Sequence, residues 1–165
     1  MKKKIFLPLV LLLVLSLVTG CGGGTTVNTK DGSVTYEKDK ATFEAKDGSK
    51  AEVNVADGEG EEASLPDDYP EDLLPIIGGA KIVLANKNEI NQQSSYLISL
   101  SSSKSPQDVY DFYKDKLKDL EDLSTSQTND LFTVNGFKGD QHLSVIITPE
   151  EDKNSSIQLG IGPKM

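Results

Sequence analysis

Few side chains in this sequence could carry out covalent or metal chemistry. Its 165 residues include one histidine, His142, and one cysteine, Cys21, and no tryptophan. A zinc site made of cysteine and histidine needs three or four such ligands, which one chain does not supply. A serine triad could use His142, but no Gly-x-Ser-x-Gly turn is present to expose a nucleophile. The sequence therefore predicts no catalytic residue, no metal site and no cofactor.

Carboxylates are the remaining groups with catalytic potential. Asp67, Asp68, Glu71 and Asp72 lie close together between two prolines. Two carboxylates held about 5 to 9 Å apart can hydrolyse a glycosidic bond. A proline-bounded acidic loop is explained more simply as a solvated surface, so a small carboxylate-dependent hydrolase of the cell envelope stays as an alternative function.

The single cysteine is placed for attachment to a membrane. Residues 1–20 carry three lysines, an apolar stretch from Ile5 to Leu15 and small or polar residues up to Gly20, which is the order of a secretory signal peptide. The apolar stretch is shorter than the roughly 20 residues that a membrane-spanning helix needs. A free thiol inside the signal peptide is the other interpretation of Cys21.

The stretch Val18-Thr19-Gly20-Cys21 resembles the lipobox of bacterial lipoproteins. The resemblance implies cleavage after Gly20 and attachment of diacylglycerol to Cys21. A diacylglyceryl group supplies two acyl chains, which hold a protein stably where one chain holds it only marginally. We therefore expect a protein that is anchored by lipid to the cell membrane and faces outward, in the envelope of a Gram-positive bacterium.

The charge of the chain excludes one class of partner. Without residues 1–20 the chain has fourteen lysines and twenty-six acidic residues, a net charge of −12, and it has no arginine. Nucleic-acid recognition favours basic surfaces and the bidentate guanidinium group, so no nucleic acid is expected as a partner. An acidic surface is also repelled by anionic headgroups, so we expect the membrane to be reached through the lipid anchor.

Residues 21–24 form the lipidated N-terminus and a glycine linker, and residues 25–56 follow as a repetitive polar segment. The tetrapeptide Lys-Asp-Gly-Ser occurs at 30–33 and again at 46–49. Asp-Gly between alternating segments is a strong hairpin signal. The segment is predicted to be either a small β-meander docked on a larger domain or a weakly structured stalk, because isolated hairpins are marginally stable in water.

Residues 57–64 are predicted to form an acidic linker. The run Asp57–Glu62 superficially suggests a calcium loop, but an EF-hand needs glycine at its sixth position and glutamate at its twelfth, and here these are Glu62 and Asp68. A solvated linker explains the composition better than a metal site does.

Residues 65–165 are predicted to form the compact domain. Ser105 and Pro106 are typical of a helix start, and Val109, Phe112, Tyr113, Leu117 and Leu120 share one helical face, which predicts a helix over 106–121. Alternating segments predict strands near 80–85, 96–101, 132–137, 143–147 and 157–161, where Asn135-Gly136 is either a turn or a bulge in the third of them. Residues 86–93 have the composition of a connection. The predicted fold is a two-layer α+β domain with an antiparallel sheet of about five strands and one helix, in the order ββαβββ, preceded by short β-hairpins.

The same region resembles a pattern found in small secreted bacterial lipoproteins. The pattern is Leu-Pro followed by acidic residues at 65–72, Gly-Gly-Ala at 78–80, Ser-Pro at 105–106 and Asp-Phe-Tyr at 111–113. The resemblance implies an architecture and an extracytoplasmic address, and no activity. Leu123-Ser124-Thr125 stands where relatives carry an aromatic residue after the helix.

These observations favour contact over chemistry. The predicted function is a lipid-anchored, non-catalytic binding or envelope-associated module, with a structural or inhibitory partner of another envelope protein as a further alternative. Tyrosine is common at interfaces, and Tyr110 lies off the main apolar stripe of the helix, so Tyr110 is the candidate interaction residue.

Overall fold

A computed structural model describes residues 24–58 and 60–164 of the chain. The predicted signal peptide, the cleavage site at Gly20 and the lipidation site at Cys21 lie outside these residues. The strands are β1 (Thr25–Asn28), β2 (Gly32–Tyr36), β3 (Lys40–Ala45), β4 (Lys50–Val55), β5 (Lys81–Ile90), β6 (Gln93–Ser102), β7 (Glu121–Gln127), β8 (Phe132–Lys138), β9 (Gln141–Pro149) and β10 (Ser155–Pro163); the helix α2 spans Pro106–Lys116, and a 3-10 turn, η1, spans Glu151–Lys153.

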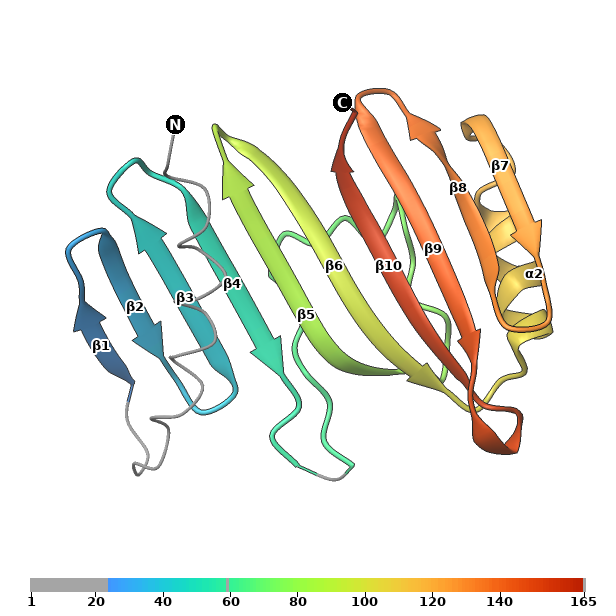
Figure 1. Cartoon of the computed structure of the whole chain (residues 1–165), viewed down its shortest axis with the longest axis horizontal. Helices are drawn as coiled ribbons and strands as arrows, with labels where there is room; N and C mark the ends of the chain where they lie inside the picture. The colour runs from blue at the N-terminus through green and yellow to red at the C-terminus, as the bar shows by residue number, and fades with distance from the viewer. Residues whose placement is uncertain (1–23, 59, 165) are drawn as a thin grey trace.

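All ten strands form one antiparallel sheet in the order β1-β2-β3-β4-β5-β6-β10-β9-β8-β7. Figure 1 shows the strands side by side, with α2 behind β8 and the connection from β4 to β5 behind the middle of the sheet. The prediction of a two-layer domain with about five strands is therefore wrong. The hairpins of residues 25–56 do not cover a smaller sheet; they extend it, because β4 pairs with β5.

The hairpins β1–β4 are built by a short repeat. A Lys-Asp pair stands in each of the three turns, at 30–31, 38–39 and 46–47. In the last of these turns Gly48 has φ +86, a left-handed conformation that glycine adopts without strain. The Asp47 side chain accepts a hydrogen bond from the Ser49 backbone N–H at 2.9 Å, which closes the turn.

The helix α2 begins as its sequence predicts. The Ser105 Oγ accepts a hydrogen bond from the backbone N–H of Asp108 at 3.2 Å, and Pro106 occupies the first turn. The helix ends at Lys116, not at residue 121, and the Leu117 backbone N–H still bonds to the Tyr113 carbonyl oxygen. Residues 118–120 then lead into β7, a strand that the sequence does not predict.

One layer of apolar side chains holds α2 and residues 63–80 against the sheet. The core joins the side chains of Val109, Tyr113 and Leu117 to those of β6, β8, β9 and β10. Tyr69, Leu74 and Ile77 extend this layer from the connection between β4 and β5. We call this side of the sheet the covered face and the opposite side the open face.

The apolar side of the sheet changes between β4 and β5. Side chains of directly paired residues lie on the same face of a sheet. Asn54 of β4 pairs with Ala85 of β5, which is fully buried on the covered face, whereas Val53 pairs with Asn86 on the open face. In β1–β4 the apolar residues therefore lie on the open face, whereas the fully buried apolar residues of β6, β10, β9 and β8 lie on the covered face.

Ion pairs occupy the covered face of β3 and β4. Lys40 Nζ lies 2.9 Å from Glu52 Oε1, and Lys50 Nζ lies 3.4 Å from Glu44 Oε1. Both ion pairs join β3 to β4. On β3, Lys40 and Glu44 stand two residues before and two residues after Thr42, which pairs with Glu52. Charged cross-strand pairs contribute roughly 0.2–1 kcal/mol each, so they stabilise this half of the sheet far less than an apolar core would.

Candidate interaction surface

The open face of β5, β6, β10, β9 and β8 carries many small uncharged polar side chains in aligned rows. One row runs Leu84, Ser99, Gln158, Ile146 and Thr133, and the next runs Asn86, Leu97, Gly160, Ser144 and Asn135. We call these two rows the serine-rich surface. Serine, threonine, asparagine and glutamine can each donate and accept hydrogen bonds, so the surface can pair with polar groups of either kind.

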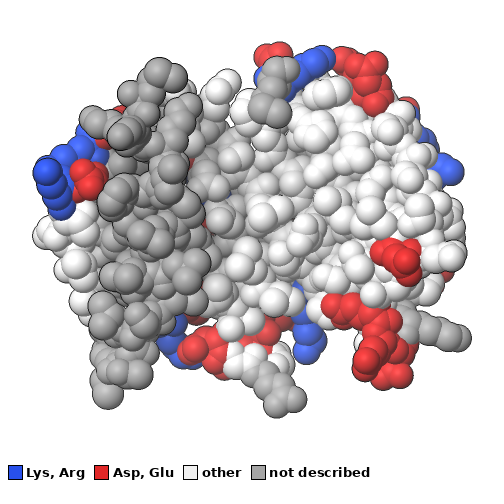
Figure 2. Space-filling model, viewed as in Figure 1, with Lys and Arg blue, Asp and Glu red and all other residues white. Residues whose placement is uncertain are grey.

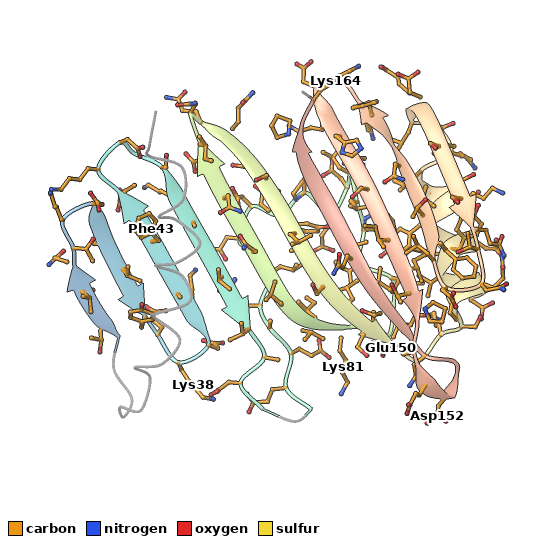
Figure 3. All side chains as sticks on the ribbon, in the orientation of Figure 1. Lys38, Phe43, Lys81, Glu150, Asp152 and Lys164 are labelled. Atoms are coloured by element: carbon orange, nitrogen blue, oxygen red, sulfur yellow. The ribbon has the colours of Figure 1, made fainter. Side chains whose placement is uncertain are left out.

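Charge is absent from the middle of this surface. Over β5, β6, β10, β9 and β8, Figure 2 shows white atoms across the centre and lysine, aspartate and glutamate atoms at the rim. Figure 3 places the labelled side chains of Lys81, Glu150, Asp152 and Lys164 at the ends of the strands. A partner could therefore dock on the centre without removing a charge from water, which is the costly step in burying a polar surface.

One exposed apolar side chain stands in the centre of the serine-rich surface. Leu97 is 45% exposed, and its partner on β10 is Gly160, which has no side chain. The Ser144 Oγ fills the space beside Gly160, because a Cβ added there would lie 2.8 Å from that oxygen. Leu97 is therefore the most exposed apolar side chain of the two rows, and Leu84 and Ile146 are half-buried.

An aromatic cluster lies at one end of the same face. The rings of Phe137 and His142 pair across β8 and β9 with centroids 5.2 Å apart, and Lys164 Nζ lies 4.5 Å from the centroid of Phe137. His142, the one histidine of the chain, thus packs beside a phenyl ring and a lysine. Among the described residues, no serine hydroxyl hydrogen-bonds to its ring, so the geometry gives no triad.

Tyr110 does not lie on an exposed surface. It is 5% exposed, and its ring lies 5.7 Å from that of Phe132 on the covered face. The prediction of Tyr110 as an interaction residue is corrected by this burial. The helix is rotated about its axis relative to the predicted stripe, so that Tyr110 enters the core while Phe112 is only partly buried.

The other helix tyrosine and Tyr69 are structural. The Tyr113 hydroxyl donates to the Pro75 carbonyl oxygen at 3.1 Å, and the Tyr69 hydroxyl donates to the Leu74 carbonyl oxygen at 2.8 Å. Burial raises the pKa of both hydroxyls above the ordinary tyrosine range, so both remain protonated donors. The first bond ties residues 63–80 to the helix, and the second holds the connection in its own shape.

The acidic loop at 67–72 has one carboxylate committed to an ion pair. The Lys87 Nζ donates to Asp68 Oδ2 at 2.6 Å. Partial burial pushes the pKa of Asp68 upward, but the hydrogen bond and the charge of Lys87 outweigh it and hold this pKa below its usual value. The hydrogen bond to Asp68 in turn raises the pKa of Lys87. Asp68 is therefore a structural acceptor and a poor candidate for an acid catalyst.

No metal site and no deep active-site cleft emerge from the described residues. Among them, no group of three or more histidine, cysteine, aspartate and glutamate side chains is placed to hold a metal ion. The two best-formed depressions are open to solvent, one beside Pro149–Asn154 and one between Gly78 and Phe112. Within residues 24–58 and 60–164, no helix is long and apolar enough to cross a bilayer.

Comparisons with known proteins add no relative. No protein-family model matches the chain, and no curated protein or solved structure matches it significantly.

The sequence contains a signal for the serine-rich surface in the run Ser99–Ser103. The end of a strand followed by a helix cap explains this run locally, but that interpretation does not predict that the serines share a surface with residues of other strands. In the structure Ser99 and Ser101 face the open side of β6, and Ser102 faces the covered side, where its hydroxyl accepts from the Lys104 backbone N–H at 3.2 Å. In the sequence, the signal for an uncharged open face is that serines alternate with the buried side chains of β6.

Proposed function

We propose that this protein is a lipid-anchored extracytoplasmic lipoprotein that acts as a non-catalytic, envelope-associated binding module. Its contact surface in this proposal is the open face of the sheet, with the serine-rich surface at its centre. The lipobox-like sequence at 18–21 supports the anchor. The observation that carries the binding role is the uncharged centre of the open face on a chain with a net charge of −9.

A preformed sheet suits binding for a physical reason. The serine-rich side chains stand on strands that pair on both sides, so little backbone order is lost when a partner docks. Charged residues are depleted at the centres of protein interfaces, as they are here. The hydrolase alternative receives no comparable support, because Asp68 is bound to Lys87 and the described depressions are shallow.

The binding role is tested by placing charge on the centre of the surface. The double variant Ser99→Glu, Gln158→Glu adds two neighbouring carboxylates on β6 and β10. An unpaired charge buried at an interface costs on the order of 1–3 kcal/mol, so recovery of the partner from detergent-solubilised membranes should fall at least about tenfold. The control Ser103→Glu, Gln107→Glu adds the same charge at exposed positions near the helix start and should leave recovery unchanged.

Two results would count against the binding role. One is equal recovery of the same partner with the wild type and with the Ser99→Glu, Gln158→Glu variant. The other is turnover of a glycan or peptide substrate by the wild-type protein without any specific partner.

The anchor is tested separately by Cys21→Ser. We expect this variant to leave the membrane fraction or to remain as uncleaved precursor, because no thiol is left to receive diacylglycerol. Processed Cys21→Ser protein that stays in membranes would contradict the lipobox interpretation.

A further inference from the structure

We propose that the open face of β1–β4 lies on the lipid surface to which Cys21 is attached, so that the membrane itself is the partner of this part of the sheet. The inference rests on the proposed lipid anchor and names the partner of one half of the open face. It is supported by the distance from the anchor to the sheet, by the apolar side chains on this face and by the distribution of charge along the chain.

The folded sheet begins almost at the anchor. Cys21 is three residues before Gly24, the first residue that the structure describes, and β1 begins at Thr25. Three extended residues span about 10 Å at most. Because β1–β4 continue into β5 as one sheet, they do not act as a flexible stalk that would let the domain stand away from the membrane. The anchor therefore holds β1 next to the headgroups.

The open face of these four strands is apolar. Its apolar members are Val27, Val34, Tyr36, Ala41, Phe43, Ala45, Ala51, Val53 and Val55, and Thr25 and Gly32 share the face with them. Val34, near the centre, is 9% exposed, while Val27 and Val55 near the margins are 47% and 41% exposed. In the described part of the chain, the extensive contacts of β1–β4 are with neighbouring strands only, and α2 contacts β8 and β9. Transfer of such a face from water to a lipid surface is favourable.

Most of the acidic residues of the chain lie outside the sequence of this half of the sheet, although Asp57 and Glu61 pair with Lys38 in the turn between β2 and β3. Residues 24–56 contain five lysines and six acidic residues, a net charge of −1, whereas residues 57–165 contain nine lysines and twenty acidic residues, a net charge of −11. An anionic membrane therefore repels the second half and leaves the first half nearly unaffected. The ion-paired side chains of β3 and β4 occupy the covered face and point away from the lipid in this arrangement.

A second copy of the chain is the competing occupant of this face. If two copies paired through this face, residues 24–56 of each copy would bring a charge of only −1, but residues 57–165 of each would bring a charge of −11. The lipid anchors would hold both copies at the same membrane surface. A lipid surface covers the apolar face without bringing two acidic segments together, so the observations favour a lipid surface over a second copy.

The test uses single-cysteine labelling of the lipidated protein. The chain has no cysteine besides Cys21, whose thiol is consumed by the lipid, so a new cysteine can be labelled alone. An environment-sensitive fluorophore is placed at Val27→Cys or Val55→Cys on the open face. The matched controls are Thr26→Cys, the neighbour of Val27 on the opposite face of the same strand, and Lys50→Cys on the covered face of β4. All proteins are reconstituted in vesicles of phosphatidylcholine.

We expect the labels at 27 and 55 to shift to shorter emission wavelength and to be shielded several-fold from aqueous iodide, while the labels at 26 and 50 stay accessible. Quenching by spin-labelled lipid should show the reverse order. Equal iodide access at all four positions, in protein whose mass shows the lipid and which floats with the vesicles, would overturn the inference and leave the anchor intact.

The remaining outcomes separate the anchor from the docking face. Protein without lipid on Cys21, recovered in solution, would overturn the proposed function itself. Shielding at 27 and 55 in the unlipidated Cys21→Ser protein without vesicles, growing with protein concentration, would assign the face to a second copy and overturn the lipid surface as partner.

Discussion

In both halves of the sheet apolar and polar residues alternate along the strands, but the two halves place their apolar side chains on opposite faces. In β6, β10, β9 and β8 the apolar side chains face α2 and residues 63–80 and form the core. In β1–β4 the apolar side chains face the other way, and ion pairs stand where a core would be. Alternation with a period of two therefore predicts a strand, but it does not tell which face of the finished sheet is buried.

The reversal has a physical origin in the pairing of β4 with β5. Shifting that pairing by one residue would move every apolar side chain of β1–β4 to the covered face. In the observed register Val55 pairs with Leu84 on the open face, and Asn54 pairs with Ala85 on the covered face. Asn54 is 4% exposed, and its side-chain amide donates to Glu52 at 3.0 Å, so the covered face is polar at this strand. Among residues 24–58 and 60–164, the two halves thus share backbone hydrogen bonds but no continuous apolar core.

Removal of one apolar side chain from each half should give the largest difference between the two halves. Leu159 of β10 is fully buried in the core, so Leu159→Ala should lower the free energy of unfolding by about 2–5 kcal/mol. Phe43 of β3 pairs with Val34 and Ala51 on the open face, so Phe43→Ala should cost at most about 1 kcal/mol in solution. Denaturant unfolding of the unlipidated protein measures both. Equal losses would mean that a core also covers β1–β4.

A glycine in β8 tests the close approach of the chain that leads into β7. A Cβ at Gly136 would lie 2.8 Å from the Leu120 Cβ and 3.0 Å from the Glu121 carbonyl oxygen. Gly136→Ala should therefore cost about 1–3 kcal/mol of unfolding free energy through overpacking. A Cβ added at Gly78 would meet no heavy atom within 4 Å, so Gly78→Ala should change stability by less than about 0.5 kcal/mol. A neutral Gly136→Ala would show that Leu120 can move aside.

Local sequence signals are enough for elements and not for their assembly. Alternation locates most strands, and Ser105-Pro106 locates the start of α2. Residues 86–90 have the polar composition of a connection, yet they form the end of β5 because β4 and β6 pair with them on both sides. The edge strand β7 has every residue exposed and therefore no apolar alternation to detect.

The candidate site is harder to predict than the fold elements. Tyr110 is singled out by one helical stripe, but the position of a helix on a sheet depends on the side chains it meets, here Phe132. The serine-rich surface joins residues from β5, β6, β8, β9 and β10, which only the strand order brings side by side. No single stretch of sequence contains that arrangement. Composition predicts a protein without catalytic groups, and this stays a prediction.

Removal of the N-cap of α2 tests the half of the sheet that the helix covers, and its expected effect on stability is smaller. The Ser105 Oγ accepts from the Asp108 N–H at 3.2 Å, and the hydroxyl donates to Asp108 Oδ2 at 2.7 Å. Ser105→Ala should cost about 1 kcal/mol of unfolding free energy, and Ser105→Asp should restore most of the N–H bond. Helix signal in circular dichroism and denaturant unfolding report the change. An unchanged stability in Ser105→Ala would show that tertiary packing alone fixes the start of α2.

The smallest effect concerns the ion pair at the boundary of the two halves. Lys87 reaches from β5 to Asp68 in residues 63–80, and the Asp68 side chain is 53% exposed, so the pair should contribute only about 0.2–1 kcal/mol at neutral pH. The folded-state pKa of Asp68 lies below its ordinary value, so this stability is present above the unfolded pKa of about 3.9 and is lost as the pH falls through the lower folded value. The difference between wild type and Asp68→Asn in denaturant unfolding should therefore shrink below about pH 4.

The matched control for this ion pair is Asp67→Asn, which removes the neighbouring exposed carboxylate and leaves the Lys87–Asp68 pair in place. If the Asp68→Asn difference instead persisted at low pH, the side chain would act through its neutral hydrogen bonds. The edge-to-face packing of Tyr69 on Tyr96, with ring centroids 5.7 Å apart, would then hold the connection between β4 and β5 to the sheet without help from charge. The boundary between the halves would in that case depend on the same apolar layer as the core, and not on the ion pairing that is typical of β3 and β4.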